Sequence, residues 1–206
     1  MIAIVDYGMG NLASVQKAFS YINYESCITN DKQVLANASG VVLPGVGAYA
    51  PAMEALKSQG LDVVLKDIVN QNKPFLGICL GMQLLFDGSE EGSEDGELID
   101  GLGIIPGRVV RFPKDKTVDV GLKVPQMDWN SLEDTTGSSF TGGGYVYFAH
   151  SYYCIPSRKE DVAANTTYGV KYCVSVEKNN IFATQFHPEK SGSVGLSMLT
   201  RFARRT

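Results

Sequence analysis

Short apolar runs alternate with helical patterns along the first half of the chain, and this alternation restricts the possible folds most. Residues 2–5 and 41–43 are apolar at every position, so neither run has a side suited to solvent. Between such runs, apolar residues recur three or four positions apart, which marks one face of a helix. These residues are Leu12, Val15, Phe19 and Ile22 in one stripe, and Leu61, Val64, Leu65 and Ile68 in the other. Strands that are apolar on both sides predict an α/β fold, with a mostly parallel central sheet and helices on both faces.

The second half of the chain is richer in β-branched and aromatic residues. Segments 107–112, 118–124, 145–149, 170–177 and 181–186 have this composition and are separated by Gly, Asn, Ser or Asp. Lys178-Asn179-Asn180 predicts a hairpin turn between the last two segments. We therefore expect added antiparallel strands here. A final helix is expected over residues 193–205, and the residues expected to face inward are Met198, Leu199 and Phe202.

Length and composition indicate a self-sufficient globular chain. With 206 residues and 44% hydrophobic content, it can form a core without disulfides or a structural metal. We expect one domain over residues 1–206, because no linker or low-complexity tract divides the chain. A net charge of -4 gives no electrostatic footprint for nucleic acid. No apolar run approaches the roughly 18 residues that span a bilayer, and residues 1–5 do not resemble a signal peptide, so a cytoplasmic protein is predicted.

Four cysteines and two histidines are the candidate metal ligands. The cysteines Cys27, Cys79, Cys154 and Cys173 show no paired spacing, and only His150 and His187 could join them. We therefore expect no metal, no other cofactor and reduced thiols.

Cys79 lies between two glycines, in Gly77-Ile78-Cys79-Leu80-Gly81, where an apolar run becomes a helical pattern. Residues 73–78 are typical of a short buried strand, and residues 81–86 are typical of the start of a helix. A sharp strand-to-helix turn exposes its central side chain, and glycines permit the strained backbone of such a turn. A helix N-terminus also favours a thiolate. The pattern predicts that Cys79 is a nucleophile.

A base and a carboxylate occur together much further along, in Phe186-His187-Pro188-Glu189. In an extended segment, residues two positions apart point to the same side, so Glu189 can reach His187. The imidazole would hold the proton of Cys79, and the carboxylate would fix its tautomer. Together with Cys79, these residues predict a catalytic triad.

These motifs resemble those of class I (triad-type) glutamine amidotransferases, and the resemblance extends over almost the whole chain. The matching stretches are Gly77-Ile78-Cys79-Leu80-Gly81-Met82-Gln83, Phe186-His187-Pro188-Glu189-Lys190-Ser191 and Pro44-Gly45-Val46-Gly47. The resemblance implies a flavodoxin-like fold and hydrolysis of L-glutamine through a cysteinyl thioester. It also implies an oxyanion hole and a glutamine pocket. The oxyanion donors would be Leu80 together with Gly45 or Val46, and the substrate-binding residues would be Gln83, Glu91, His150, Ser151 and Tyr152.

Three further stretches are similar to the glutaminase subunits of imidazole glycerol phosphate synthases, which act in histidine biosynthesis. They are residues 4–12, Gln126-Met127-Asp128-Trp129-Asn130 and His150-Ser151-Tyr152-Tyr153. This resemblance implies that ammonia passes to a separate (β/α)₈-barrel subunit, expected on another polypeptide because the chain ends after its last helix. The candidate contact residues are Asn11, Trp129 and Lys190. Members of this group typically read His-Met-Gly-Trp-Asn where this chain has Gln126-Met127-Asp128-Trp129-Asn130.

Other interpretations remain open at this point. Residues 8–13 and Glu25 give the outline of a dinucleotide-binding fingerprint, but this explains neither Cys79 nor His187. A non-catalytic subunit and another triad amidotransferase, of the anthranilate or pyridoxal-phosphate-synthase type, are further alternatives. Trp129 is an interface anchor or a core residue, and His150 is a scaffold residue or a ligand contact. The acidic segment 87–100 is expected to be a solvated loop, apart from Glu91, or a mobile cover beside the nucleophile.

Overall fold

The computed structural model describes residues 1–93, 97–133 and 137–206. Its main sheet has the strand order β2-β1-β3-β4-β13-β12-β10-β7-β5-β6, and β11 pairs with β12 off this path. The parallel part comprises β1 (Ile2–Val5), β2 (Ser26–Thr29), β3 (Gly40–Gly45), β4 (Phe75–Cys79) and β13 (Ile181–Thr184). Within it, every neighbouring pair runs in the same direction. The predicted parallel sheet is confirmed.

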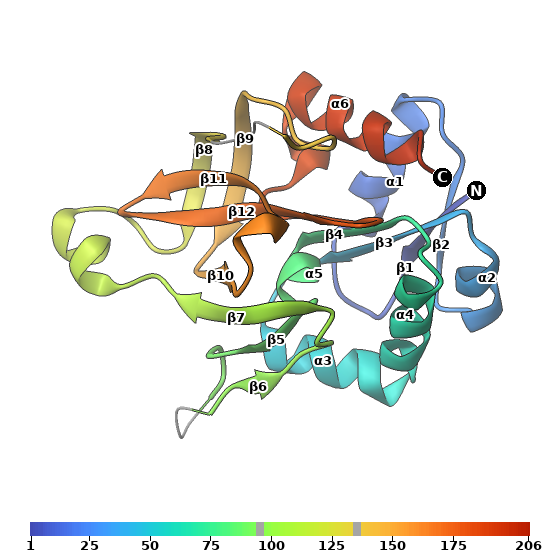
Figure 1. Cartoon of the computed structure of the whole chain (residues 1–206), viewed down its shortest axis with the longest axis horizontal. Helices are drawn as coiled ribbons and strands as arrows, with labels where there is room; N and C mark the ends of the chain where they lie inside the picture. The colour runs from blue at the N-terminus through green and yellow to red at the C-terminus, as the bar shows by residue number, and fades with distance from the viewer. Residues whose placement is uncertain (94–96, 134–136) are drawn as a thin grey trace.

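Helices cover both faces of this sheet, as the apolar strands predict (Figure 1). The helices are α1 (Leu12–Tyr21), α2 (Lys32–Asn37), α3 (Tyr49–Ser58), α4 (Leu61–Asn70), α5 (Leu80–Gln83) and α6 (Gly192–Ala203). On one face α1 packs near α6, and the rings of Phe19 and Phe202 lie 6.3 Å apart. The other face carries α2, α3 and α4.

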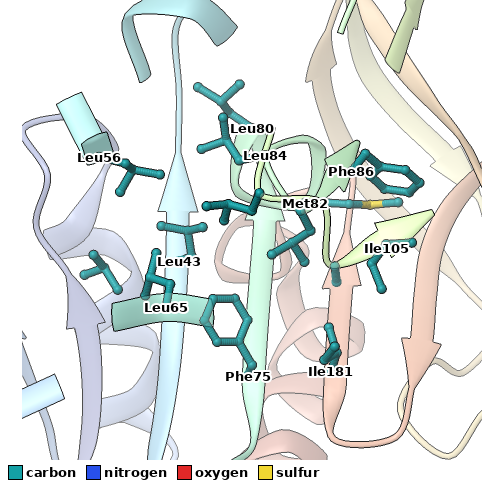
Figure 2. Packing of buried hydrophobic residues seen from close by; sticks show 14 of the residues in the cluster. Leu43, Leu56, Leu65, Phe75, Leu80, Met82, Leu84, Phe86, Ile105 and Ile181 are labelled. Atoms are coloured by element: carbon teal, nitrogen blue, oxygen red, sulfur yellow. The ribbon is translucent and has the colours of Figure 1, made fainter. Parts of the chain in front are cut away.

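Alternate side chains of each strand enter opposite cores. Ile2 and Ile4 of β1 join the cluster beneath α1 and α6, whereas Ala3 and Val5 join the cluster beneath α2, α3 and α4. Figure 2 shows part of this second cluster, in which buried side chains of strands and helices meet. Its labelled members are Leu43, Leu56, Leu65, Phe75, Leu80, Met82, Leu84, Phe86, Ile105 and Ile181. Burial on both faces fixes the sheet in register.

The second half of the chain adds a mixed extension and a separate ribbon. The extension is formed by β5 (Phe86–Ser89), β6 (Ile99–Asp100), β7 (Ile105–Arg111), β10 (Tyr152–Pro156), β11 (Val162–Tyr168) and β12 (Val170–Lys178). The ribbon pairs β8 (Gln126–Ser131) with β9 (Tyr145–His150). Lys178 of β12 lies opposite Ile181 of β13, which confirms the predicted hairpin turn. The final helix is also confirmed, with Met198, Leu199 and Phe202 buried.

Three local predictions are wrong. Residues 118–124 are not a strand. The 3₁₀ helix η1 (Lys114–Lys116) precedes them, a second 3₁₀ helix, η2 (Val118–Val120), begins them, and Gly121 ends η2 in a left-handed conformation. The helix expected over 81–86 ends after one turn. The carbonyl groups of Leu84 and Leu85 accept hydrogen bonds from residues 102, 104 and 105 instead of from a following helical turn. The acidic segment 87–100 is not a continuous loop, since it contains β5 and β6; its residues 94–96 lie outside the described residues.

The remaining 3₁₀ helices are η3 (Lys159–Asp161) and η4 (Pro188–Lys190). Within the described ranges, no helix has the length and apolar character needed to cross a membrane.

Candidate active site

Cys79 is the last residue of β4 and directly precedes α5. Its backbone has φ 55° and ψ -110°, a combination that non-glycine residues rarely adopt. The neighbouring glycines make this turn possible, because there is no room for a side chain at either position. A Cβ at Gly81 would lie 1.8 Å from the carbonyl oxygen of Leu43, and a Cβ at Gly77 would lie 2.9 Å from that of Gly81. The strained backbone holds the thiol at the strand-to-helix turn.

We expect Gly81→Ala to lower the free energy of unfolding by about 3 kcal/mol, because the added methyl group meets a backbone carbonyl that belongs to β3. Gly143→Ala is the matched control, since a Cβ at Gly143 meets nothing within 4 Å. Its effect should stay below about 0.5 kcal/mol. Denaturant unfolding of both variants measures the difference. Equal stability of the two variants would show that the turn tolerates a side chain.

The parallel pairing of β13 with β4 brings His187 to Cys79. Thr184 at the end of β13 lies opposite Ile78, so the residues that follow β13 continue beside the strand-to-helix turn at Cys79, called the elbow below. Cys79 and His187 line the same cavity and interact strongly enough for Cys79 to raise the pKa of His187, whose Nδ1 lies 2.8 Å from Glu189 Oε1. The side chains of His187 and Glu189 are 4% and 2% exposed. Sulfur, imidazole and carboxylate are thus brought together in one buried site.

The environment of His187 favours its protonated form. Burial alone would lower the pKa of His187. Hydrogen bonding to Cys79 and Glu189 and the charges of both groups outweigh this effect, and the pKa is raised to about 10. His187 is therefore protonated at neutral pH. Because the carboxylate of Glu189 only accepts, it fixes Nδ1 as a donor and directs Nε2 toward the sulfur.

His150 lies in the same region but has the opposite character. Burial lowers its pKa to about 4, and the charge of His187 adds to this effect. Its Nδ1 donates to the carbonyl oxygen of Tyr152 at 2.8 Å, and its Nε2 contacts the hydroxyl group of Tyr172 at 3.1 Å. Both ring nitrogens are thus engaged by the protein itself, which favours a scaffold role for His150.

These two environments predict an unusual titration of the only two histidines in the sequence. In a pH titration followed by NMR of the imidazole carbons, one histidine should titrate near pH 4 and the other near pH 10. In Cys79→Ala, the higher pKa should fall, since a hydrogen bond and a negative charge are removed from His187. A histidine that titrates between pH 6 and 7 in the wild-type protein would contradict this description of the site.

A cavity of about 260 Å³ opens above Cys79 and His187. All five predicted substrate-binding residues line it: Gln83, Glu91, His150, Ser151 and Tyr152. Gly47 of the predicted oxyanion stretch also lines the cavity, as does Pro125, which no sequence motif marks. A larger cavity of about 500 Å³ lies between α4 and the β12–β13 turn, remote from the elbow.

Glu91 lines the cavity and also forms a hydrogen bond with the protein backbone. Its Oε2 accepts a hydrogen bond of 3.2 Å from the backbone N–H of Tyr49, the first residue of α3. Burial raises the pKa of Glu91, and this hydrogen bond opposes the shift. The carboxylate therefore supports a helix N-terminus while facing the cavity.

The predicted oxyanion segments adjoin the elbow. Gly45 at the end of β3 lies opposite Cys79, and a Cβ at Gly45 would lie 2.5 Å from the hydroxyl oxygen of Tyr7. That hydroxyl group donates to the carbonyl oxygen of Pro44 at 3.0 Å. Val46 is 41% exposed and lines the cavity together with Leu80. Sequence reasoning misses the contribution of Tyr7, whose contact with Pro44 depends on the pairing of β1 with β3.

The Gly8–Gly10 loop packs against the same segment. A Cβ at Gly10 would lie 3.7 Å from both Cα and N of Gly45. This contact favours a role in shaping the oxyanion segment over dinucleotide binding.

The three predicted interface residues have different settings. Trp129 on β8 is 49% exposed and lies opposite Tyr147, whose carbonyl oxygen accepts from the backbone N–H of His187. This exposure excludes the core interpretation of Trp129. Lys190 is exposed and lines the cavity. Asn11 caps α1, and its side chain accepts a hydrogen bond of 3.3 Å from the N–H of Ser14.

Known proteins share both the sequence pattern and the fold. The family model for glutamine amidotransferase class-I matches residues 3–205. Imidazole glycerol phosphate synthase subunit HisH of Geobacter metallireducens is 47% identical, over 98% of this chain and 97% of its own. The protein of that name from Geobacillus thermodenitrificans is 46% identical, over 98% and 94%.

Solved structures confirm the fold. A glutamine amidotransferase has a TM-score of 0.73 at 18% identity and covers 100% of this chain and 98% of its own. PurLQS from Thermotoga maritima has a TM-score of 0.74 at 17% identity, over 98% and 97%. With the family model matched along nearly its whole length, the chain belongs to the class I glutamine amidotransferase family.

Proposed function

We propose that this protein is the glutaminase subunit of an imidazole glycerol phosphate synthase. It hydrolyses L-glutamine to glutamate and ammonia, with Cys79 as nucleophile, His187 as acid and base, and Glu189 as orienting carboxylate. The observation that carries the proposal is that Cys79 and His187 line one cavity of about 260 Å³, with Glu189 2.8 Å behind the imidazole. The names of the relatives support the biosynthetic setting.

The reaction follows from where the proton resides. The sulfur of Cys79 attacks the side-chain carbonyl carbon of glutamine, while His187 gives its proton to the amide nitrogen. The C–N bond breaks, ammonia leaves and a thioester remains. Water then attacks the thioester as His187 accepts a proton from it. Collapse of the second intermediate releases glutamate and returns the sulfur to its starting state.

The oxyanion of both intermediates needs donors that point into the cavity. The backbone N–H of Leu80 supplies one, and Gly45 or Val46 supplies the other. Losing one such donor typically costs about 10²–10³ in rate. The glycines on either side of Val46 allow a peptide of this segment to change orientation, so the segment acts as a switch that the partner controls.

The partner is a (β/α)₈-barrel subunit that binds as a heterodimer and receives the ammonia. It converts a phosphoribulosyl-formimino aminoimidazole carboxamide ribonucleotide into imidazole glycerol phosphate and an aminoimidazole carboxamide ribonucleotide. Asn11, Trp129 and Lys190 belong to the contact surface. Asp128, which stands where the family typically has glycine, belongs to the same surface, because its Oδ1 accepts a hydrogen bond from the N–H of Trp129.

A glutaminase assay with and without the barrel subunit and its nucleotide tests the proposal. The isolated chain should hydrolyse glutamine very slowly, and the rate should rise sharply in the complex. Cys79→Ala, assayed in parallel, gives the background. Equal rates with and without the partner would reject the switch, and the lack of glutamine hydrolysis under both conditions would reject the function.

A further inference from the structure

We propose that Gln185 is a further catalytic residue, whose side-chain amide donates a hydrogen bond to the sulfur of Cys79. Gln185 is fully buried, and its Nε2 lies 3.8 Å from the sulfur. A buried amide is costly unless each polar atom has a partner. The placement of this one at the reacting atom therefore points to a task that an apolar residue could not perform.

The orientation of the amide is fixed by a chain of hydrogen bonds that begins at a backbone carbonyl. The carbonyl oxygen of Tyr152 can only accept, so the side-chain atom of Gln83 that faces it at 3.0 Å must be Nε2. The same nitrogen donates to Oε1 of Gln185 at 3.0 Å. With its oxygen engaged in this way, Gln185 turns its nitrogen toward Cys79.

Gln185 and His187 follow directly after β13, which is paired with β4 and so runs beside Cys79. The N–H of Gln185 donates to the carbonyl oxygen of Val174 at 2.8 Å, and the N–H of His187 donates to that of Tyr147 at 3.0 Å. Both residues are therefore held through their backbone by neighbouring strands, and both side chains interact with Cys79.

The two donors have different consequences for the chemistry. His187 exchanges a proton during the reaction, whereas a neutral amide donates without giving up its proton. A hydrogen bond to a charged acceptor is stronger than one to a neutral acceptor. The amide of Gln185 therefore stabilises the anionic sulfur before attack and again when the C–S bond of the thioester breaks. This catalytic consequence rests on the proposed function, but the contact with the sulfur does not.

Alkylation of Cys79 by iodoacetamide tests the contact without glutamine. Gln185→Met removes the donor and keeps an unbranched side chain of similar size. At pH 7 it should react about tenfold more slowly at Cys79, as read by mass spectrometry of the Cys79 peptide, and its rate–pH profile should move to higher pH. In the complex, kcat for glutamine should fall about tenfold while KM changes less than about threefold.

Ser175→Ala is the matched control. It removes another buried hydrogen bond, from Ser175 Oγ to the carbonyl oxygen of Ala183, on the strand next to β13. Its alkylation rate and kcat should stay within about twofold of the wild-type values. Unchanged alkylation in Gln185→Met, with an unchanged pH profile, would overturn the proposal.

A measurement on the wild-type chain covers the case in which Gln185→Met does not fold. The side-chain amide protons of Gln185 should move downfield in NMR spectra over the pH range in which Cys79 alkylation accelerates, and they should stay in place in Cys79→Ala. Chemical shifts of the Gln185 amide protons that do not change with pH in this range, or that change equally in Cys79→Ala, would overturn the proposal. Slower alkylation in Gln185→Met together with a lack of glutaminase activity in every complex would reject the proposed function and leave this contact standing.

Discussion

Cys79→Ala should abolish the use of glutamine while free ammonium still supports synthesis by the proposed barrel subunit. The variant lacks the only atom that the proposed mechanism places in covalent contact with the substrate, and loss of such a nucleophile costs about 10⁴–10⁶ in kcat. The site is otherwise unchanged, because alanine is small enough for the buried turn, where Cys79 is 5% exposed. Synthesis with ammonium bypasses this chain and should proceed at the wild-type rate.

The measurement compares product formation by the complex with glutamine and with an ammonium salt. Cys27→Ala is the control for loss of a thiol, because Cys27 lies on the outer strand β2 and is only partly buried. It should retain both activities. Glutamine turnover in Cys79→Ala above about one thousandth of the wild-type rate would remove Cys79 from the mechanism.

Glu189→Gln should lower kcat for glutamine by about 10³–10⁴ and leave the protein folded. The carboxylate holds Nδ1 of His187 as a donor at 2.8 Å. An amide can present its own N–H to that nitrogen, which stabilises the wrong tautomer and prevents Nε2 from exchanging a proton with the sulfur. In a Ser-His-Asp triad, the equivalent loss of the carboxylate lowers kcat about 10⁴-fold. The pKa of His187 should also fall, since a negative neighbour is removed.

Steady-state kinetics of the complex and thermal unfolding of the variant give the two readouts. Glu54→Gln makes the same chemical change on the exposed side of α3 and should leave kcat within about twofold of the wild type. A kcat for Glu189→Gln within tenfold of the wild-type value would show that Glu189 does not orient the base.

The parts of the fold that the sequence predicts well are those in which local pattern and tertiary packing agree. The strand at 2–5 and the helical stripe that begins at Leu61 have one clear periodicity, and the structure buries the strand together with Leu61, Leu65 and Ile68 of the helix. Residues 118–124 have strand-like composition, but Val118 and Val120 remain exposed in 3₁₀ turns. Composition alone could not show this, because strand propensity reflects packing against neighbouring strands.

The short helix after Cys79 illustrates the same limit. Apolar residues continue through Leu84, Leu85 and Phe86, and all three are buried, so a helix and a strand are equally consistent with the sequence. Backbone hydrogen bonds from residues 102–105 decide between them. These partners lie almost twenty positions away, where a local pattern contains no information.

Some residues of the candidate site could be predicted from the sequence, and others could not. Cys79, His187 and Glu189 occur in recognisable motifs, so their proximity could be expected. The extended geometry expected for Glu189 is wrong, because it lies in the 3₁₀ helix η4, yet its carboxylate still reaches Nδ1 of His187. Gln185 and Tyr7 act through pairings between strands that are remote in sequence, and no local motif marks them. For Gln185 a signal did exist: it lies two positions before His187, within the strand-like segment 181–186.

Covalent labelling by a glutamine-mimicking electrophile tests the central claim most directly. The claim is that a reactive sulfur lies within reach of a bound glutamine side chain. We predict one adduct per chain on the Cys79 peptide, formed more slowly in the presence of excess L-glutamine and lost in His187→Ala. An adduct on Cys27, or labelling of Cys79 at a rate that glutamine does not change, would contradict the account.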